Sequence, residues 1–216
     1  MKMEFKPGLN RKGVSLIELL VALVISAIVI AGIYRIFISQ TKSYYVQEQV
    51  MEVQQNTRSA MEILLRDLRM TGFDDDNAKS LIAIAKPITA VGDNSITVNY
   101  EYYDRDDSTY KKHTVAYWRD ANAATVFRQL SVDDVPNASE PLLENVDALT
   151  FAYGIDQNDD GIVDSWVPAA GVGSIKVIAV RVTLVARPEQ TNEDVRKIVS
   201  PRALDSIVSM RNLCLR

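Results

Sequence analysis

The sequence is poor in the residue types on which many enzymes and metalloproteins depend. Among its 216 residues there is one cysteine, Cys214, and one histidine, His113. A single cysteine cannot form an intramolecular disulfide or a multi-cysteine metal site, so the fold rests on neither. Cys214 is therefore expected to be a free thiol, with an intermolecular bridge in an oxidising compartment as the alternative.

Several function classes also lack their sequence signatures. His113 lies in an alternating stretch, KKHTV, which favours a strand-surface histidine over a member of a Ser-His-Asp arrangement. No GxxxxGK[ST] phosphate loop occurs, so the chain does not supply its own ATPase. A formal net charge of -4 gives no global indication of nucleic-acid binding. We therefore do not expect an enzyme or a nucleic-acid-binding protein.

The chain does contain a long apolar run close to its N-terminus. Residues 1–13 carry four basic side chains against one acidic one, and residues 19–34 carry no charge at all. About 20 apolar residues suffice to cross a bilayer as a helix. Because the basic segment should remain cytoplasmic, the rest of the chain is expected to be exported.

Two ordinary explanations of this run are incomplete. A secretory signal peptide has a shorter apolar core that ends in a small-residue cleavage site. A plain signal anchor explains the length but not Glu18, the only charge between Val14 and Tyr34. An acid at the centre of a membrane helix costs about 2.5–3.5 kcal/mol, and less near its end, so Glu18 calls for a functional partner.

The segment from Gly13 to Leu20, GVSLIELL, resembles the processing motif of type IV prepilins. The resemblance implies that residues 1–13 are a leader peptide, which a prepilin peptidase cuts between Gly13 and Val14. It also implies N-methylation of Val14, where many family members have phenylalanine. Glu18 matches the acid at the fifth mature position, which in this family faces the N-terminal amine of a neighbouring subunit and sets the register of assembly.

A single helix is predicted from Val14 to about Met70, because no proline interrupts this stretch. Residues 14–38 would form its transmembrane part, and residues 39–72 would pack on a globular domain, with a free coiled coil as the alternative. Gly72 is a plausible stop. The packing face is the apolar stripe at helical spacing formed by Val46, Val50, Val53, Thr57, Met61, Leu64, Leu65 and Leu68.

Residues 73–216 predict a β-rich domain. Period-two alternation marks strands at 95–103, 109–119, 125–130, 149–155 and 174–187, and turn residues separate them. In the first of these strands, one face is predicted to carry Ile96, Val98, Tyr100 and Tyr102. The ambiguous stretch 206–212 is interpreted as a last strand. The fold class is therefore α+β: an antiparallel sheet that covers the end of one long helix, as in the type IV pilin fold.

One loop has the spacing of a calcium site. Oxygen ligands alternate at Asp156, Asn158 and Asp160, a glycine stands sixth, and Ile162 and Asp164 could contribute a carbonyl and a carboxylate. The twelfth position is Val167, where an EF-hand has a bidentate glutamate. Ca²⁺ is thus a candidate ligand, and the alternative is an acidic hairpin loop whose Asx side chains cap their own backbone.

The second half of the chain, from ENVDALTF through SIKVIAVRVTLVAR to VSMRNL, resembles PilW-type minor pilins. The resemblance implies an assembly-initiating subunit of a type IV pilus. Its partners would be other pilin or minor pilin subunits, the prepilin peptidase and the inner-membrane assembly platform. The chain would begin in the inner membrane as a single-pass protein.

Three alternatives remain. One is a pseudopilin of a type II secretion system, which would place the chain in a periplasmic pseudopilus rather than a cell-surface pilus. Another is a signal-anchored periplasmic binding module or enzyme, which would gain nothing from Glu18. The last is an adhesin, for which no aromatic or polar cluster in the sequence marks a binding site.

Overall fold

A computed structural model describes residues 13–74, 84, 86–188 and 200–214. The chain divides into two compact units, which are Met1–Gln47 and Glu48–Arg216. The leader predicted at residues 1–13 lies outside the described residues except for Gly13. We refer to the two units as the N-terminal and the C-terminal unit.

Helix α1 (Leu16–Met70) is continuous over 55 residues. Its bounds agree with the predicted helix from Val14 to about Met70. The helix ends where expected, because Gly72 has a left-handed φ of 71° that side chains with a Cβ rarely adopt. A Cβ at Gly72 would also lie 2.6 Å from Leu213 Cδ2, so the end of that side chain would have to move, but it is the backbone conformation that selects glycine.

The C-terminal unit holds two antiparallel sheets where the sequence predicted one. In the six-stranded sheet the order is β1 (Ile88–Val91), β2 (Ser95–Asp104), β3 (Thr109–Asp120), β4 (Thr125–Val132) and β5 (Val135–Pro136), with β6 (Glu140–Leu143) also paired to β4. The four-stranded sheet has the order β10 (Arg202–Ser209), β9 (Lys176–Ala186), β7 (Val146–Asp156) and β8 (Ser165–Val167).

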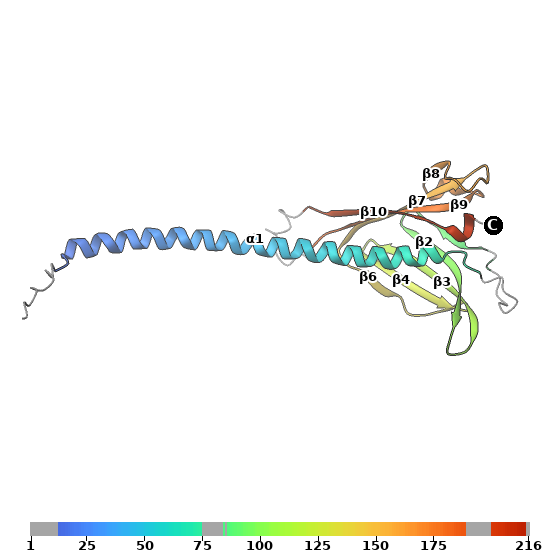
Figure 1. Cartoon of the computed structure of the whole chain (residues 1–216), viewed down its shortest axis with the longest axis horizontal. Helices are drawn as coiled ribbons and strands as arrows, with labels where there is room; N and C mark the ends of the chain where they lie inside the picture. Colours follow the sequence, from blue (N-terminus) through green and yellow to red (C-terminus); the bar gives the residue numbers. More distant parts are fainter. Residues whose placement is uncertain (1–12, 75–83, 85, 189–199, 215–216) are drawn as a thin grey trace, which may run out of the picture. The chain divides into compact units, whose positions relative to one another are not determined.

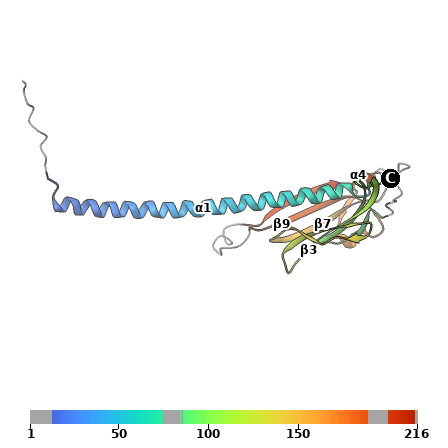
Figure 2. The same cartoon turned by 90° about the horizontal axis from the view of Figure 1, so that it is seen from below.

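The two sheets flank the part of α1 that belongs to the C-terminal unit. Figure 1 shows β9 and β10 on one side of this part and β4 and β6 on the other. Seen from below, β3, β7 and β9 lie along this C-terminal part of α1 (Figure 2). The short helix α4 (Arg211–Cys214) lies at the C-terminal end of α1. A second short helix, α2 (Ala169–Val172), connects β8 to β9.

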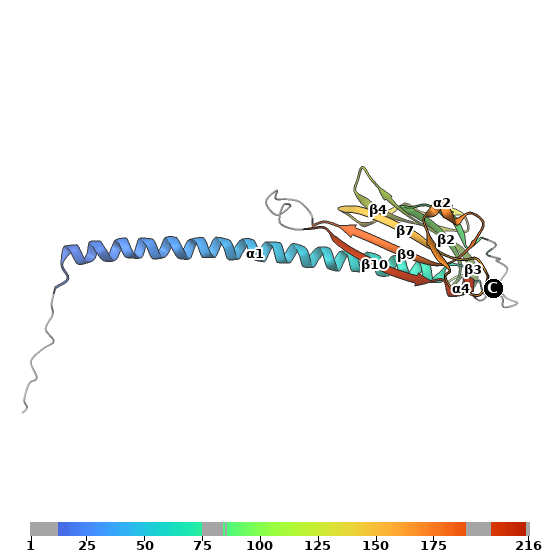
Figure 3. The same cartoon turned by 90° about the horizontal axis from the view of Figure 1, so that it is seen from above.

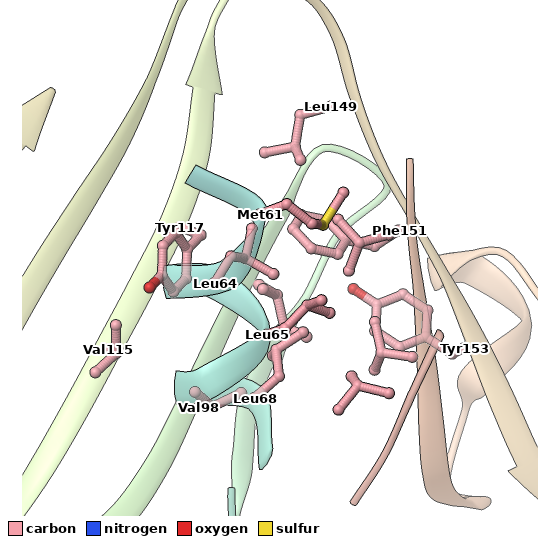
Figure 4. Close-up of a cluster of buried hydrophobic side chains, with 14 of the residues drawn as sticks. Met61, Leu64, Leu65, Leu68, Val98, Val115, Tyr117, Leu149, Phe151 and Tyr153 are labelled. Carbon is pink, nitrogen blue, oxygen red and sulfur yellow. The ribbon is translucent and has the colours of Figure 1, made fainter. Parts of the chain in front are cut away.

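The core forms where the apolar stripe of α1 meets the inner faces of both sheets (Figure 4). The stripe is buried from Val53 onward, whereas Val46 and Val50 are only half-buried. β2 and β3 contribute side chains from one sheet, and β7 and β9 contribute side chains from the other. The labelled members are Met61, Leu64, Leu65, Leu68, Val98, Val115, Tyr117, Leu149, Phe151 and Tyr153.

Two local predictions need correction. Tyr102 was predicted on the same face of its strand as Ile96, Val98 and Tyr100. Those three side chains are buried, but Tyr102 is 51% exposed near the end of β2, where it stacks on the ring of His113. The final strand begins earlier than predicted, at Arg202, and ends at Ser209. The following residues from Arg211 form α4. α4 contacts the residues that follow α1, because Asn212 Nδ2 donates to Thr71 O at 3.2 Å.

Candidate assembly site

The predicted processing site lies directly before α1. Gly13 and Val14 have no helical or strand structure, and both are exposed, Val14 at 73%. Nothing lies within 4 Å of the place where a Cβ on Gly13 would stand. Such a segment can enter an active-site cleft without unfolding, so cleavage between Gly13 and Val14 is compatible with the local structure and stays a prediction.

Glu18 forms a capping box with Ser15 at the start of α1. The Glu18 carboxylate Oε2 accepts from the Ser15 amide at 3.3 Å and from its hydroxyl at 3.4 Å. In return, the Glu18 amide donates to Ser15 Oγ at 3.3 Å. These contacts satisfy donors that a helix start leaves without intrahelical partners. Ser-x-x-Glu is a recognisable sequence signal for this motif, whereas the predicted role of Glu18 came from the family resemblance alone.

The residues that follow form an exposed apolar surface. All side chains of residues 13–40 are exposed, and the most apolar 18-residue window in α1 has a mean hydropathy of 2.8. Within the described residues α1 is the one helix long and apolar enough to cross a membrane. An exposed apolar patch of this size is typical of a membrane or protein contact, and the transmembrane segment at 14–38 stays a prediction.

Further along α1, a buried polar cluster ties the helix to the six-stranded sheet. Tyr117 on β3 donates its hydroxyl to Asp67 Oδ2 at 2.6 Å. Arg128 on β4 pairs with the same carboxylate through Nε and Nη2, each at 2.9 Å, and its Nε also donates to the Tyr117 oxygen at 3.1 Å. Burial and the neighbouring Asp67 carboxylate raise the pKa of Tyr117, so its hydroxyl remains a donor. We call these three residues the Asp67 cluster.

The Asp67 cluster was not predicted from the sequence. A signal was present, because an aspartate at position 67 stands between the apolar residues Leu65 and Leu68. A buried carboxylate requires a cationic or hydrogen-bonding partner. No pattern in one sequence, however, names Tyr117 and Arg128, which lie 50 and 61 residues away.

The loop from Asp156 to Asp164 is held by its own acidic side chains. Asp156 is buried, and its carboxylate accepts from the amides of Asp159, Asp160 and Gly161 at 2.7, 3.3 and 2.9 Å. Burial raises the pKa of Asp156, but these backbone donors outweigh that effect, and the resulting pKa lies below the ordinary value. Asp156 is thus fully ionised at neutral pH and fixes the turn.

The other predicted ligands are also engaged within this loop. Asn158 Nδ2 donates to Asp160 Oδ2 at 3.1 Å, and the Ile162 amide donates to Asp160 Oδ1 at 2.8 Å. Asp164 Oδ2 accepts from the Gln157 amide at 2.7 Å. Across residues 13–74, 84, 86–188 and 200–214, no three His, Cys, Asp or Glu side chains are grouped as a metal would need. The contacts favour the self-capped loop, and Ca²⁺ binding stays a prediction.

His113 lies on a strand surface, as its sequence context predicted. It pairs with Tyr100 across the β2–β3 ribbon, with ring centroids 5.5 Å apart, and stacks on Tyr102 at 5.0 Å. Partial burial lowers its pKa from the ordinary value. These two ring contacts are typical of a histidine on a strand surface.

Comparisons with known proteins agree with both predicted resemblances, to the type IV prepilin motif and to PilW-type minor pilins. The prokaryotic N-terminal methylation motif matches residues 8–34, which include Gly13, Val14 and Glu18. The family described as Type IV Pilus-assembly protein W matches residues 116–208, from β3 to β10. The chain thus joins a prepilin-type N-terminus to a PilW-type domain, and its resemblance to PilW-type minor pilins of the type IV prepilin superfamily is confirmed.

One solved structure is also similar. A type IV-like pilin from Thermus thermophilus has 12% sequence identity and a TM-score of 0.47, with 74% of this chain and 97% of that chain covered. No curated protein matches the sequence.

Proposed function

We propose that this chain is a minor pilin: a membrane-inserted subunit of a type IV pilus that acts in filament assembly through its helix. The observation that carries the proposal is an exposed apolar helix, headed by a methylation motif, in a chain with a PilW-type domain. Such a helix needs lipid around it before assembly and the helices of neighbouring subunits after it.

The start of α1 suggests how neighbouring subunits would be aligned. Cleavage after Gly13 would leave a positively charged amine on Val14, next to the positive end of the helix dipole. A carboxylate from a neighbouring subunit would neutralise this amine in a low-dielectric setting, and Glu18 is the only acid in the apolar run. The capping box then gives Glu18 a resting partner, Ser15, until the amine of a neighbour becomes available.

The C-terminal unit would present a rigid surface outside the membrane. The buried Asp67 cluster joins α1 to the six-stranded sheet, and the apolar stripe joins it to both sheets. Partners would be other pilin subunits, the prepilin peptidase and the inner-membrane assembly platform. The proposed location is the inner membrane first and the cell-surface filament later.

Filament fractions test the proposal directly. Filaments are sheared from cells that express the full chain and are probed with an antibody to the C-terminal unit. The chain should be found in this fraction at low copy number, and its deletion should reduce the number of filaments. Retention of all the protein in the membrane fraction, together with normal filaments in the deletion strain, would reject the minor-pilin role.

A further inference from the structure

The two sheets differ in how their edge strands are protected. β5 and β6 contain Pro136 and Pro141, β1 has four residues and an irregular register, and β8 has three residues. The part of β7 beyond β8 is covered in part, because the Phe151 amide donates to Asp93 O at 2.8 Å. Short strands, prolines and irregularities are the means by which proteins prevent strand addition at an edge.

β10 has none of these three protections. Its eight residues pair with β9 without a break in register, and the nearest proline, Pro201, precedes the strand. Among the described strands, β10 has a neighbour on the β9 side alone. Figure 3 shows β10 at the margin of the four-stranded sheet, beside α1. It is the one long and regular edge strand in the described part of the chain.

The register identifies which backbone groups point away from β9. The Met210 amide donates to Ile178 O at 2.8 Å, and these two residues continue the register of the β10–β9 pair. In an antiparallel ladder, hydrogen-bonded and non-hydrogen-bonded pairs alternate. Leu204, Ser206 and Val208 therefore bond to β9, whereas the amides and carbonyls of Ala203, Asp205 and Ile207 point to the open side.

A groove runs beside this open edge. It has a volume of about 590 Å³ and lies between α1 and β10, with Arg58 and Glu62 on the helix side and Leu204 and Ser206 among the strand residues. Arg58 and Glu62 pair with each other at 3.1 Å, so they add no net charge. An extended segment in the groove could bond to β10 along one side and contact α1 on the other.

We propose that the open edge of β10 is a strand-addition site for an extended segment of a different subunit of the same filament. The inference rests on the proposed minor-pilin role, since a filament neighbour would bring the segment. Main-chain hydrogen bonds would supply affinity, and the groove would select side chains at alternate positions.

Self-pairing of two copies is less favourable than a different partner. An antiparallel pair of β10 strands centred on Asp205 places two carboxylates opposite each other, and like charges in that position are destabilising. The register centred on Ser206 places Asp205 opposite Ile207, which gives the carboxylate no cationic partner. A segment of another chain can place a basic or polar residue at this point.

The test uses the full chain in intact cells, with a photo-crosslinking amino acid in place of Ala203. It compares Ile207→Pro, which removes an outward amide but no bond to β9, with the matched control Ile207→Ala, which keeps the amide. We expect an adduct whose cross-linked peptide maps to an extended segment of another filament subunit. The adduct should be lost at least tenfold in I207P and kept in I207A.

Amide hydrogen exchange on the wild-type chain gives a second readout if I207P does not fold. The amides of Ala203, Asp205 and Ile207 should exchange rapidly in detergent and slowly in filaments, whereas those of Leu204 and Ser206 should be slow in both. If the chain is present in filaments, any of three results would overturn strand addition. These are no adduct, an adduct with a second copy, and equal exchange of the outward amides in detergent and in filaments. Absence of the chain from filaments would overturn the minor-pilin role and the inference together.

Discussion

Glu18 has two candidate roles, and they make different demands on its side chain. At the third helical position, where it closes the capping box, Glu18 needs an oxygen that accepts from Ser15, which glutamine also provides. As the partner of a neighbour's amine, it needs a negative charge, which glutamine lacks. The sequence predicted the second role through the family resemblance, whereas the structure shows the first.

Substitution at Glu18 separates these roles. Glu18→Gln and Glu18→Ala should both insert into the membrane and both fail to enter filaments, because each removes the charge. Only E18A should also weaken the helix start, by about 1 kcal/mol. The measurement is the ratio of the chain in sheared filaments to that in membranes. Wild-type incorporation of E18Q would show that the capping box alone accounts for this acid.

His113 gives a second prediction at the scale of one residue, because it is the only histidine in the chain. Partial burial lowers its pKa in the folded state, so the unfolded chain takes up a proton first as the pH falls below 6.5. Its contribution to stability is therefore present above that pH and is lost as the pH falls through the folded-state pKa. Asp133 opposes this shift, and Arg128 adds to it.

The full chain in detergent should thus lose stability between pH 7.5 and pH 5.5, and His113→Gln should lose less over the same range. Denaturant unfolding followed by the fluorescence of Trp118 and Trp166 measures the difference. Carboxylates titrate mainly below this window, so the comparison isolates the histidine. Parallel pH profiles of the two proteins would rule out the proposed contribution.

At the scale of the element, the Asp67 cluster should decide how firmly α1 is held on its sheet. Asp67→Ala leaves the half-buried Arg128 without its carboxylate, and the free energy of unfolding should fall by about 3 kcal/mol. Tyr117→Phe removes one hydrogen bond and should cost about 1–2 kcal/mol. Denaturant unfolding of the full chain in detergent measures both.

Arg66 is the matched control for this cluster. It lies 3.7 Å from the same aspartate but is largely exposed, so Arg66→Ala should change stability by less than about 1 kcal/mol. A cost for R66A equal to that of D67A would mean that charge near the helix, rather than the buried contacts, holds the elements together.

The loop at 156–164 distinguishes two interpretations of one sequence pattern. Because its carboxylates already bond to loop amides, we expect millimolar Ca²⁺ to leave the melting temperature of the full chain unchanged relative to chelated protein. A calcium site without a bidentate twelfth ligand would bind with a Kd of about 10⁻⁴–10⁻³ M and would raise the melting temperature.

If Ca²⁺ does raise the melting temperature, substitutions in the loop show whether the predicted ligands are responsible. Asp160→Ala should abolish a calcium-dependent rise, whereas Asp159→Ala should keep it, since Asp159 pairs with Lys176 and is outside the predicted ligand set. A rise that D160A abolishes and D159A retains would establish the calcium site and reject the self-capped loop.

Periodicity explains why the elements were predictable to different degrees. The stripe from Val53 to Leu68 and the alternation around Phe151 each report one buried face, and both were predicted correctly. The division into two sheets was not, because strand partners are set by contacts distant in sequence. β1, β5, β6 and β8 have two to four residues, too few for a periodic pattern to emerge.

At the scale of the whole molecule, the chain joins parts that need different surroundings. The described residues of the N-terminal unit form an exposed apolar helix, whereas the C-terminal unit has a hydrophobic core. The methylation-motif match lies in the N-terminal unit, and the PilW match lies in the C-terminal unit. Proteolytic maturation at Gly13 is what would make such a chain competent for assembly.

Mass spectrometry of the N-terminus is the most direct measurement of this maturation. The full chain is recovered from membranes and from sheared filaments, and its N-terminal peptide is sequenced in each fraction. In filaments the first residue should be Val14 with a methylated amine and no leader attached. A chain that retains residues 1–13, or one cut after the apolar run, would contradict the assignment of this protein as a prepilin.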